Sequence, residues 1–279
     1  MVPGSSANLG PGFDVLAIAV SLYTEVEIEP AESLSVHSEG EGSHLPADRD
    51  HLAVRVAREV MGHDRFELRV RSEIPVARGL GSSAALAVAA AAAAGAEDPV
   101  AVASRFEGHA ENAAASALGG LVAATFVDDT PVACSLPLDP NVALVLIVPD
   151  FELKTADARA VLPKTVDFAD AVFELGRLGI LIAGLGDLKQ LVAGAANDRL
   201  HQPARGELFP QAMGLLERLQ GGGAIVVAWS GAGSTLVAIC DRATAPAVEV
   251  AGREALARYD VAGRVLVVEP DRVGVRVSG

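Results

Sequence analysis

Apolar residues in the first half of the chain recur at two spacings, which together predict a mixture of strands and helices. Between residues 66 and 70 apolar and polar side chains alternate, as they do in a strand with one buried face. Between residues 82 and 94 the chain is rich in alanine, and Gly95 stands where such a helix would end. The predicted strands are 15–28, 33–38, 66–70 and 121–126. The predicted helices are 52–61, 82–94 and, as one helix or two, 99–118.

The second half continues this mixture. Residues 142–148 are all apolar and precede Pro149, a pattern typical of a buried strand. Two apolar runs flank a Ser-Gly-Ala-Gly-Ser turn at residues 230–234 and predict a hairpin. The remaining predicted elements are helices at 166–183, 188–195, 210–219 and 244–259 and a strand at 264–268. We therefore predict an α+β protein with two layers in each half and with domains at 1–142 and 143–279.

Composition argues against several classes of partner. The chain has 279 residues and a net charge of −14, which disfavours nucleic acid and anionic membranes, since both are bound by neutralising phosphates. The longest apolar run, residues 84–94, has 11 residues, whereas a membrane-spanning helix needs about 20. The only cysteines are Cys134 and Cys240, so we expect no disulfide framework and a reducing, cytoplasmic location.

A glycine-rich loop runs directly into the alanine-rich helix at residues 78–85. Glycines let backbone N–H groups approach an anion, and the start of a helix offers further unpaired N–H groups, so the pattern indicates a phosphate site. Alternatively, Ser82 or Ser83 serves only as the helix N-cap. The loop has no lysine and is no Walker A motif. The glycine spacing also fits a dinucleotide fold, but no strand directly precedes it and no acid-bearing strand follows.

Three further loops carry polar side chains. Residues 5–14 include Asn8 and Asp14 among turn-forming residues, and an ordinary surface loop would also explain them. The turn at 230–234 is explained by a hairpin alone. Residues 107–112 hold two acids, a histidine and an amide, which would also suit a solvated turn with a helix cap.

Taken in order, these segments resemble the GHMP superfamily of small-molecule kinases, and within it the homoserine kinase family most closely. The resemblance spans nearly the whole chain. It implies an N-terminal domain like domain 2 of ribosomal protein S5 and a ferredoxin-like C-terminal domain. The matching segments are 3–14, 75–85, 107–113, 155–163, 198–205 and 230–233.

The resemblance also implies a reaction, which is transfer of the ATP γ-phosphoryl group to the hydroxyl of L-homoserine in threonine biosynthesis, with Mg²⁺. The residues implied for the ATP phosphates are Arg78, Gly79, Leu80, Gly81, Ser82, Ser83 and Ala84. Those implied for homoserine are Asn8, Asp14, His109, Asn112, Arg159 and Arg205. The implied Mg²⁺ ligands are Ser83 and Glu107, and the implied catalytic residues are Asn8, Glu111 and Thr155.

Departures from the family pattern concern the substrate more than ATP. Ala110-Glu111 stands where the family usually has Pro-Asp, and Ser234 replaces a proline. These changes leave open a diverged kinase acting on another small hydroxy acid or amino alcohol, or a non-catalytic ATP-binding homologue. Homodimers are common in the family, but the sequence identifies no interface.

Overall fold

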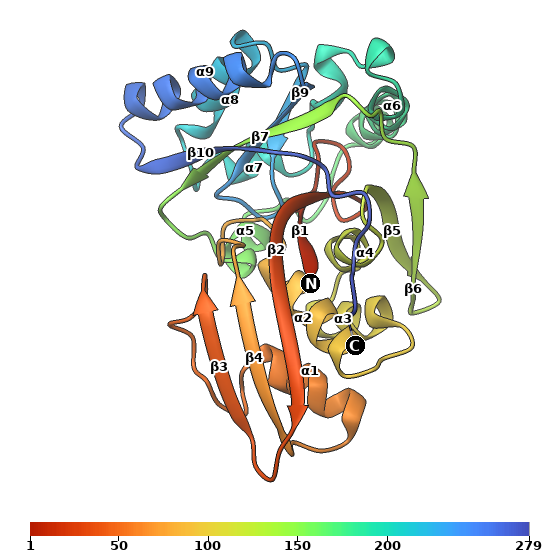
Figure 1. The fold of residues 1–279 in the computed structure, drawn as a ribbon. Coiled ribbons are helices and arrows are strands. Elements are labelled where there is room, and N and C mark those ends of the chain that lie inside the picture. The colour runs from red at the N-terminus through yellow and green to blue at the C-terminus, as the bar shows by residue number, and fades with distance from the viewer. Residues whose placement is uncertain (279) are drawn as a thin grey trace.

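Two β-sheets with their helices form the two halves of this computed structural model, which describes residues 1–278 (Figure 1). The first sheet has the order β3-β4-β2-β5-β6, and β1 pairs with β2 outside this path. All its pairings are antiparallel except that of β3 with β4. Its strands are β1 (Val2–Ala7), β2 (Leu16–Pro30), β3 (Ser35–Gly40), β4 (Phe66–Ser72), β5 (Leu121–Val127) and β6 (Thr130–Leu136).

The alanine-rich segment forms the central helix of the first half. Helix α2 packs on β1 and β2 and on the other three helices, and small side chains allow this close approach on every side. The helices are α1 (Leu52–Met61), α2 (Ser82–Ala93), α3 (Pro99–Glu107) and α4 (Glu111–Leu118). The segment at 99–118 is therefore two helices, separated by Gly108 in the left-handed conformation.

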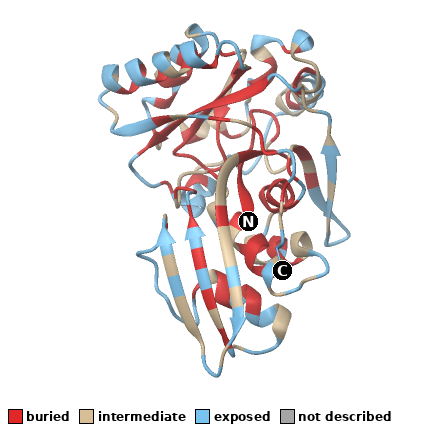
Figure 2. Cartoon of the chain, in the orientation of Figure 1, coloured by how far each residue is buried: buried red, intermediate tan, exposed pale blue. Residues whose placement is uncertain are grey.

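The second sheet is antiparallel in the order β10-β7-β9-β8. Its central strand β7 is buried along its whole length, as its apolar run predicts (Figure 2). The strands are β7 (Val142–Pro149), β8 (Val226–Trp229), β9 (Leu236–Asp241) and β10 (Gly263–Val268). The helices are α5 (Thr155–Ala160), α6 (Phe168–Gly186), α7 (Gln202–Arg205), α8 (Ala212–Gly221) and α9 (Ala245–Arg258).

One local prediction is wrong, and several elements were not expected. The helix expected at 188–195 is a pair of 3₁₀ turns, Leu188–Gln190 and Ala193–Ala196, because the chain folds back against α6. A side chain at Gly184 would meet the Leu191 backbone at 2.6 Å. Strand β6 was not expected, because its side chains are mostly exposed and it lacks an apolar run. A two-residue turn at Asp128 and Asp129, both with positive φ, connects it to β5.

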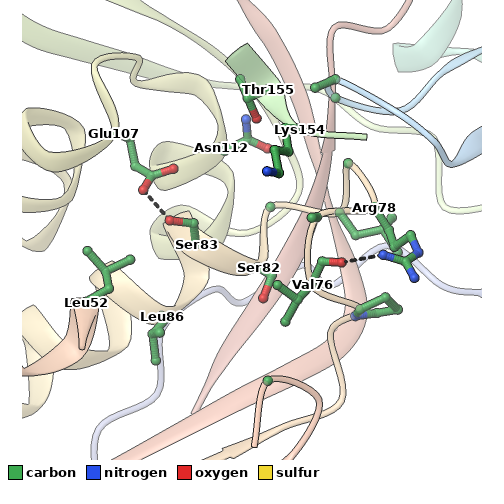
Figure 3. A pocket seen from close by; sticks show the side chains of 18 of the residues that line it. Leu52, Val76, Arg78, Ser82, Ser83, Leu86, Glu107, Asn112, Lys154 and Thr155 are labelled. Carbon is green, nitrogen blue, oxygen red and sulfur yellow. Dashed lines mark hydrogen bonds between the residues drawn. The ribbon is translucent and has the colours of Figure 1, made fainter. Parts of the chain in front are cut away.

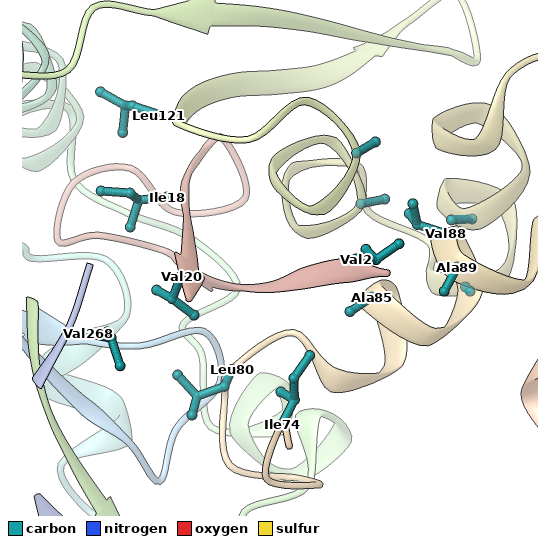
Figure 4. Close-up of a cluster of buried hydrophobic side chains, with 14 of the residues drawn as sticks. Val2, Ile18, Val20, Ile74, Leu80, Ala85, Val88, Ala89, Leu121 and Val268 are labelled. Carbon is teal, nitrogen blue, oxygen red and sulfur yellow. The ribbon is translucent and has the colours of Figure 1, made fainter. Parts of the chain in front are cut away.

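One buried apolar cluster contains residues of both halves. After β10 the chain returns to the first half, where Asp271 N–H bonds the Ala19 carbonyl and Val275 N–H bonds the Ala117 carbonyl. Val268 therefore packs in the same buried cluster as Val20 and residues of α2 (Figure 4). Among residues 1–278, no helix has the length and apolar character to cross a membrane.

Candidate active site

A cavity of about 540 Å³ lies between the two halves and is lined by both (Figure 3). All the site residues expected from the sequence line it, except Asp14 and Ala84. Ala84 is buried in the first turn of α2, and Asp14 pairs with the lining residue Arg159. The tertiary structure thus brings together segments as far apart in the chain as Asn8 and Gly231, which are 223 positions apart.

The glycine loop has the geometry of an anion cradle. Gly79 and Gly81 adopt φ of +73° and +66°, values that L side chains rarely take. A Cβ at Gly81 would lie 2.2 Å from Ser5 Oγ, so no side chain fits there. Helix α2 begins at Ser82 with Gly81 as N-cap and without a side-chain cap. The alternative in which a serine caps the helix is therefore wrong. The first N–H groups of α2 have no side-chain cap, and Gly81, Ser82 and Ser83 at this helix start line the cavity.

Two hard oxygen donors meet beside this loop. Ser83 Oγ donates a 2.5 Å hydrogen bond to Glu107 Oε1, which brings the first turn of α2 to the end of α3 (Figure 3). Within the described residues no cluster of three or more histidine, cysteine or acidic side chains could hold a metal. A pair of oxygen ligands nevertheless suits Mg²⁺, which takes most of its ligands from phosphates and water.

Arg78 connects the loop to the second half. Its Nε and Nη2 donate to the carbonyls of Pro149 and Asp150, and its Nη1 donates to Val76. The guanidinium therefore positions the glycine loop against the end of β7 in this structure. Its expected contact with ATP phosphates stays a prediction.

The Asn8 side chain holds two loops together. Asn8 Nδ2 donates to the Gly231 carbonyl at 3.0 Å, and its Oδ1 accepts the Asp14 N–H at 2.8 Å. The residue is buried and has a φ of +58°, which asparagine tolerates better than most side chains. Thus the N-terminal loop and the turn between β8 and β9 form one wall of the cavity.

Asp14 and Arg159 face each other across the two halves. Both guanidinium Nη atoms of Arg159 bond the Asp14 carboxylate, at 2.8 and 2.9 Å. This hydrogen-bonded contact raises the pKa of Arg159 above its ordinary value. The two groups expected to bind the ammonium and carboxylate of an amino acid therefore lie adjacent, each acting as the other's counter-ion.

Arg205 is fully buried behind this pair. Its Nη1 contacts His201 Nδ1 at 3.0 Å and the Gly231 carbonyl at 2.8 Å, and Phe13 lies under the guanidinium. Burial lowers the pKa of Arg205 to about 10, so it stays charged at neutral pH. Burial also lowers the pKa of His201 to about 4 and keeps that imidazole neutral beside the cation.

A second buried cluster surrounds the first turn of α4. Glu111 Oε1 accepts the Asn112 amide at 2.9 Å and lies 3.4 Å from His109 Nδ1. Asn112 Oδ1 in turn accepts the Ser5 hydroxyl. Burial raises the pKa of Glu111, and the nearby His109 opposes that rise. Glu111 Oε2 and Arg205 Nε are buried without a hydrogen-bond partner among residues 1–278, as expected of groups that await a ligand.

Sequence reasoning missed many of the lining residues, among them Lys154 and His51. Lys154 extends into the cavity (Figure 3). The sequence could have indicated it only because it precedes the predicted site residue Thr155. His51 lines the opposite end, beside apolar side chains such as Leu52 and Leu86. Its Nδ1 has no hydrogen-bond partner in the described chain, and burial lowers its pKa. Nothing in the local sequence distinguished His51 from the other histidines.

Family models match both halves of the chain. The model of the GHMP kinase N-terminal domain matches residues 51–120, and that of the GHMP kinase C-terminal domain matches residues 181–258. The homoserine kinase of Moorella thermoacetica is 38% identical, with 99% of this chain and 98% of the relative covered. That of Limosilactobacillus fermentum is also 38% identical, with 100% and 99% covered.

Solved structures agree with these relatives. The crystal structure of homoserine kinase from Cytophaga hutchinsonii has a TM-score of 0.87 at 27% identity and covers 98% of this chain and 94% of its own. The structure of L. major mevalonate kinase in complex with R-mevalonate has a TM-score of 0.71 at 17% identity, covering 99% and 96%. At that identity the second likeness concerns the fold alone. The two-sheet GHMP kinase architecture expected from the sequence is confirmed.

Proposed function

Because the chain belongs to the homoserine kinase family of the GHMP kinases, we propose that this cavity transfers the γ-phosphoryl group of ATP to the hydroxyl of L-homoserine. In this step the homoserine oxygen bonds to the γ-phosphorus, the bond to the β-phosphate oxygen breaks, and ADP leaves. The observation that carries the proposal is that one cavity is lined both by the uncapped start of the glycine-loop helix and by Arg159, which is paired with Asp14 beside the cavity. The first suits a triphosphate, and the second suits a zwitterion.

The triphosphate lies on the glycine loop in this proposal. Backbone N–H groups at the start of α2 bind its oxygens, and the loop glycines allow the approach. Ser83 and Glu107 hold Mg²⁺, which neutralises phosphate charge when bound. Lys154 adds a further positive charge at the mouth of the loop, and the apolar end near His51 receives the nucleobase.

L-Homoserine inserts between groups that are paired in the free protein. Its ammonium replaces Arg159 beside Asp14, and its carboxylate takes the guanidinium of Arg159 together with the unpartnered Nε of Arg205. An acid lacking the ammonium would leave Asp14 without a cation, which disfavours substrates such as mevalonate. Asn8 holds the hydroxyl end, because its amide keeps one free donor after bonding Gly231.

Glu111 accepts the proton of the reacting hydroxyl. Its raised pKa lies nearer to neutral pH than the pKa of an ordinary glutamate does, and its Oε2 has no hydrogen-bond partner among residues 1–278. Asn112 and His109 orient the carboxylate, while Thr155 lies across the cavity near the phosphates. Because phosphoryl transfer has a loose transition state, positioning contributes most of the acceleration.

We also propose that the domains divide at residue 142. In support, β6 belongs to the first sheet and β7, beginning at Val142, to the second. A cytoplasmic location stays a prediction.

The test measures ADP release with Mg·ATP and L-homoserine, beside D-homoserine, L-serine, shikimate and mevalonate. We expect selective turnover of L-homoserine. In a Glu107→Gln variant we expect kcat to fall at least about 100-fold, because a charged Mg²⁺ ligand is lost. Glu97→Gln, an exposed acid outside the cavity, is the control and should leave kcat unchanged.

Other outcomes would contradict parts of the proposal. Turnover of another substrate in the panel would identify a diverged kinase, and ATP binding without turnover would identify a non-catalytic homologue. Full activity of the Glu107→Gln variant would remove that residue from the metal site.

A further inference from the structure

Residues 150–154, which we call the connecting segment, join β7 to α5 and form no helix or strand of their own. Their course determines where α5 lies, and α5 presents Arg159 to the cavity, while Lys154 and Thr155 line it where the segment meets the helix. A segment without regular structure has no repeating backbone hydrogen bonds, so its position depends on individual tertiary contacts. Those contacts therefore decide how this part of the second half reaches the substrates.

Bonds within the second half fix only the start of the connecting segment. Asp150 N–H donates to the Ala262 carbonyl at 2.9 Å. The next residue, Phe151, accepts the Ser234 hydroxyl at its carbonyl, at 2.7 Å. Neither bond holds the segment against the first half, which carries the glycine loop.

Arg78 supplies a charged link between the connecting segment and the first half. Its Nε donates to the Pro149 carbonyl at 2.9 Å, and its Nη2 donates to the Asp150 carbonyl. Its Nη1 donates to the Val76 carbonyl, just before the glycine loop (Figure 3). One charged side chain thus bonds carbonyls of both halves, and a hydrogen bond from a charged donor is about twice as strong as a neutral one.

Two other links tie the stretch from the end of β7 to the end of α5 to the first half, within the part of the chain that the structure describes. One is a backbone bond of 3.2 Å from Leu153 N–H to the Ala77 carbonyl. The other is the pair of Arg159 with Asp14, which homoserine opens in the proposed function. Once that pair has opened, Arg78 provides two of the three remaining hydrogen bonds across this junction.

The glycine loop, by contrast, is held without the Arg78 side chain. Ser5 N–H of β1 donates to the Leu80 carbonyl at 3.0 Å. Ser230 Oγ, from the turn between β8 and β9, donates to the Gly79 carbonyl at 2.7 Å. Loss of the guanidinium should therefore displace the connecting segment and α5 more than it displaces the loop.

We propose that Arg78 is a positioning residue for the acceptor substrate, because it holds α5 where Arg159 can meet the homoserine carboxylate. This inference rests on the proposed function, since it takes homoserine as the ligand of Arg159. It differs from a direct contact of Arg78 with the ATP phosphates, because turning the guanidinium toward a phosphate would break its bonds to both halves. Arg78 lies where the halves meet, so its effect reaches the homoserine end although it precedes the glycine loop.

Steady-state kinetics of Arg78→Met and Arg78→Lys distinguish the two roles. We expect the KM for L-homoserine to rise at least about tenfold in Arg78→Met, because a shift of about 1 Å at Arg159 disturbs a preorganised site. The KM for ATP should stay within about threefold, since the loop keeps its own bonds. Arg78→Lys should lie between the two, because one ammonium can bond neighbouring carbonyls but cannot reproduce the planar fork.

Arg272→Met is the matched control. Arg272 lies outside the cavity lining, and its Nη1 and Nη2 donate to the carbonyls of Leu138 and Asp139. It therefore also uses a guanidinium to bond the carbonyls of two neighbouring residues, but away from the connecting segment. We expect both variants to lose stability in urea unfolding, and only Arg78→Met to raise the KM for homoserine.

Hydrogen exchange without ligands tests the same link independently of the reaction. Peptides that cover residues 150–160 should exchange at least about threefold faster in Arg78→Met than in wild type, because local opening of this stretch becomes easier. In Arg272→Met the same peptides should exchange at the wild-type rate. Circular dichroism shows whether each variant folds, and Arg78→Lys keeps the test informative if Arg78→Met does not.

These measurements separate failure of the inference from failure of the proposed function. A wild type that does not phosphorylate L-homoserine contradicts the proposed function, and the homoserine role of Arg78 falls with it. In an active wild type, a KM for ATP that rises as much as or more than the KM for homoserine would assign Arg78 to the phosphates and overturn the inference alone. Unchanged exchange of residues 150–160 in Arg78→Met would also overturn it, as would an equal rise in the KM for homoserine in Arg272→Met.

Discussion

At the scale of single residues, burial shifts the pKa of three groups that line the cavity, Glu111, Arg205 and His51. Glu111 is almost fully buried, and desolvation raises its pKa above the ordinary value of 4.5. A carboxyl with a raised folded pKa contributes most stability below its unfolded pKa, and that contribution is lost as the pH rises through the folded pKa. At neutral pH, which lies above the unfolded pKa, burying Glu111 therefore lowers the stability of the fold, which is consistent with a residue retained for chemistry.

Glu111→Gln should separate these two effects. We expect its melting temperature to exceed that of wild type at about pH 8 and to converge with it near pH 4, where both side chains are neutral. We expect kcat to fall about 100-fold, with loss of the acidic limb of the pH–rate profile. The matched control is Glu174→Gln, a buried glutamate with a raised pKa outside the cavity. Glu174→Gln should raise the melting temperature at about pH 8 without lowering kcat. A Glu111→Gln variant with wild-type kcat would exclude a role of Glu111 in proton transfer.

At the scale of elements, the junction between the glycine loop and α2 combines a backbone requirement with a steric one. Gly81 has a φ of +66°, and its missing side chain makes room for Ser5 of β1. Asn112 of α4 bonds the same serine. Three elements therefore converge on one glycine, and the position of the loop depends on all of them.

Gly81→Ala should weaken ATP binding as well as stability. The positive φ alone costs an alanine about 1–2 kcal/mol of unfolding free energy, and the contact with Ser5 Oγ must in addition move the loop. Gly95→Ala is the matched control, because Gly95 has a φ of +84° and open space around it. We expect both variants to lose stability in urea unfolding but only Gly81→Ala to raise the KM for ATP, by about tenfold or more. Equal KM values would show that the loop tolerates the shift.

At the scale of the whole molecule, the two halves build opposite ends of one cavity. The end around His51, where we propose that the nucleobase binds, comes from the first half, whereas Arg159 and Arg205 reach the proposed homoserine end from the second half. The shared core and the returning C-terminal segment hold the halves together. Changes at one end should therefore affect one substrate only.

Arg205→Lys tests this separation. A lysine has its three N–H donors on one nitrogen, so it cannot bond His201 and Gly231 from the position of Nη1 and also present a donor where Nε now lies; we therefore expect the KM for homoserine to rise at least about tenfold. The KM for ATP should stay within about twofold, as the substitution lies outside the phosphate loop. Arg199→Lys, an exposed arginine on the same segment, serves as the control. An equal rise for both substrates would place Arg205 in domain closure rather than in substrate binding.

The local pattern of apolar and polar residues by itself determines several elements of this protein. Alternation at 66–70, the apolar run at 142–148 and the paired runs around residues 230–234 each specify a strand, because burial on one or both faces dictates those spacings. The glycine loop before an alanine-rich helix likewise predicts an anion site from backbone chemistry alone, and the structure shows the uncapped helix start that such a site needs. At 188–195 the spacing of apolar residues predicts a helix, but the segment forms two 3₁₀ turns. The prediction is wrong because packing against α6 overrides the local spacing.

Only the tertiary structure decided which charges meet. The pairing of Asp14 with Arg159, the burial of Arg205 against His201, and the positions of Lys154 and His51 depend on contacts between residues far apart in the chain. No local spacing encodes such contacts. The outward apolar face of α6 is similar, because a helix spacing shows two faces but only packing shows which face the protein covers. A sequence therefore specifies local conformation through neighbouring residues, whereas charge, burial and exposure follow from the assembled fold.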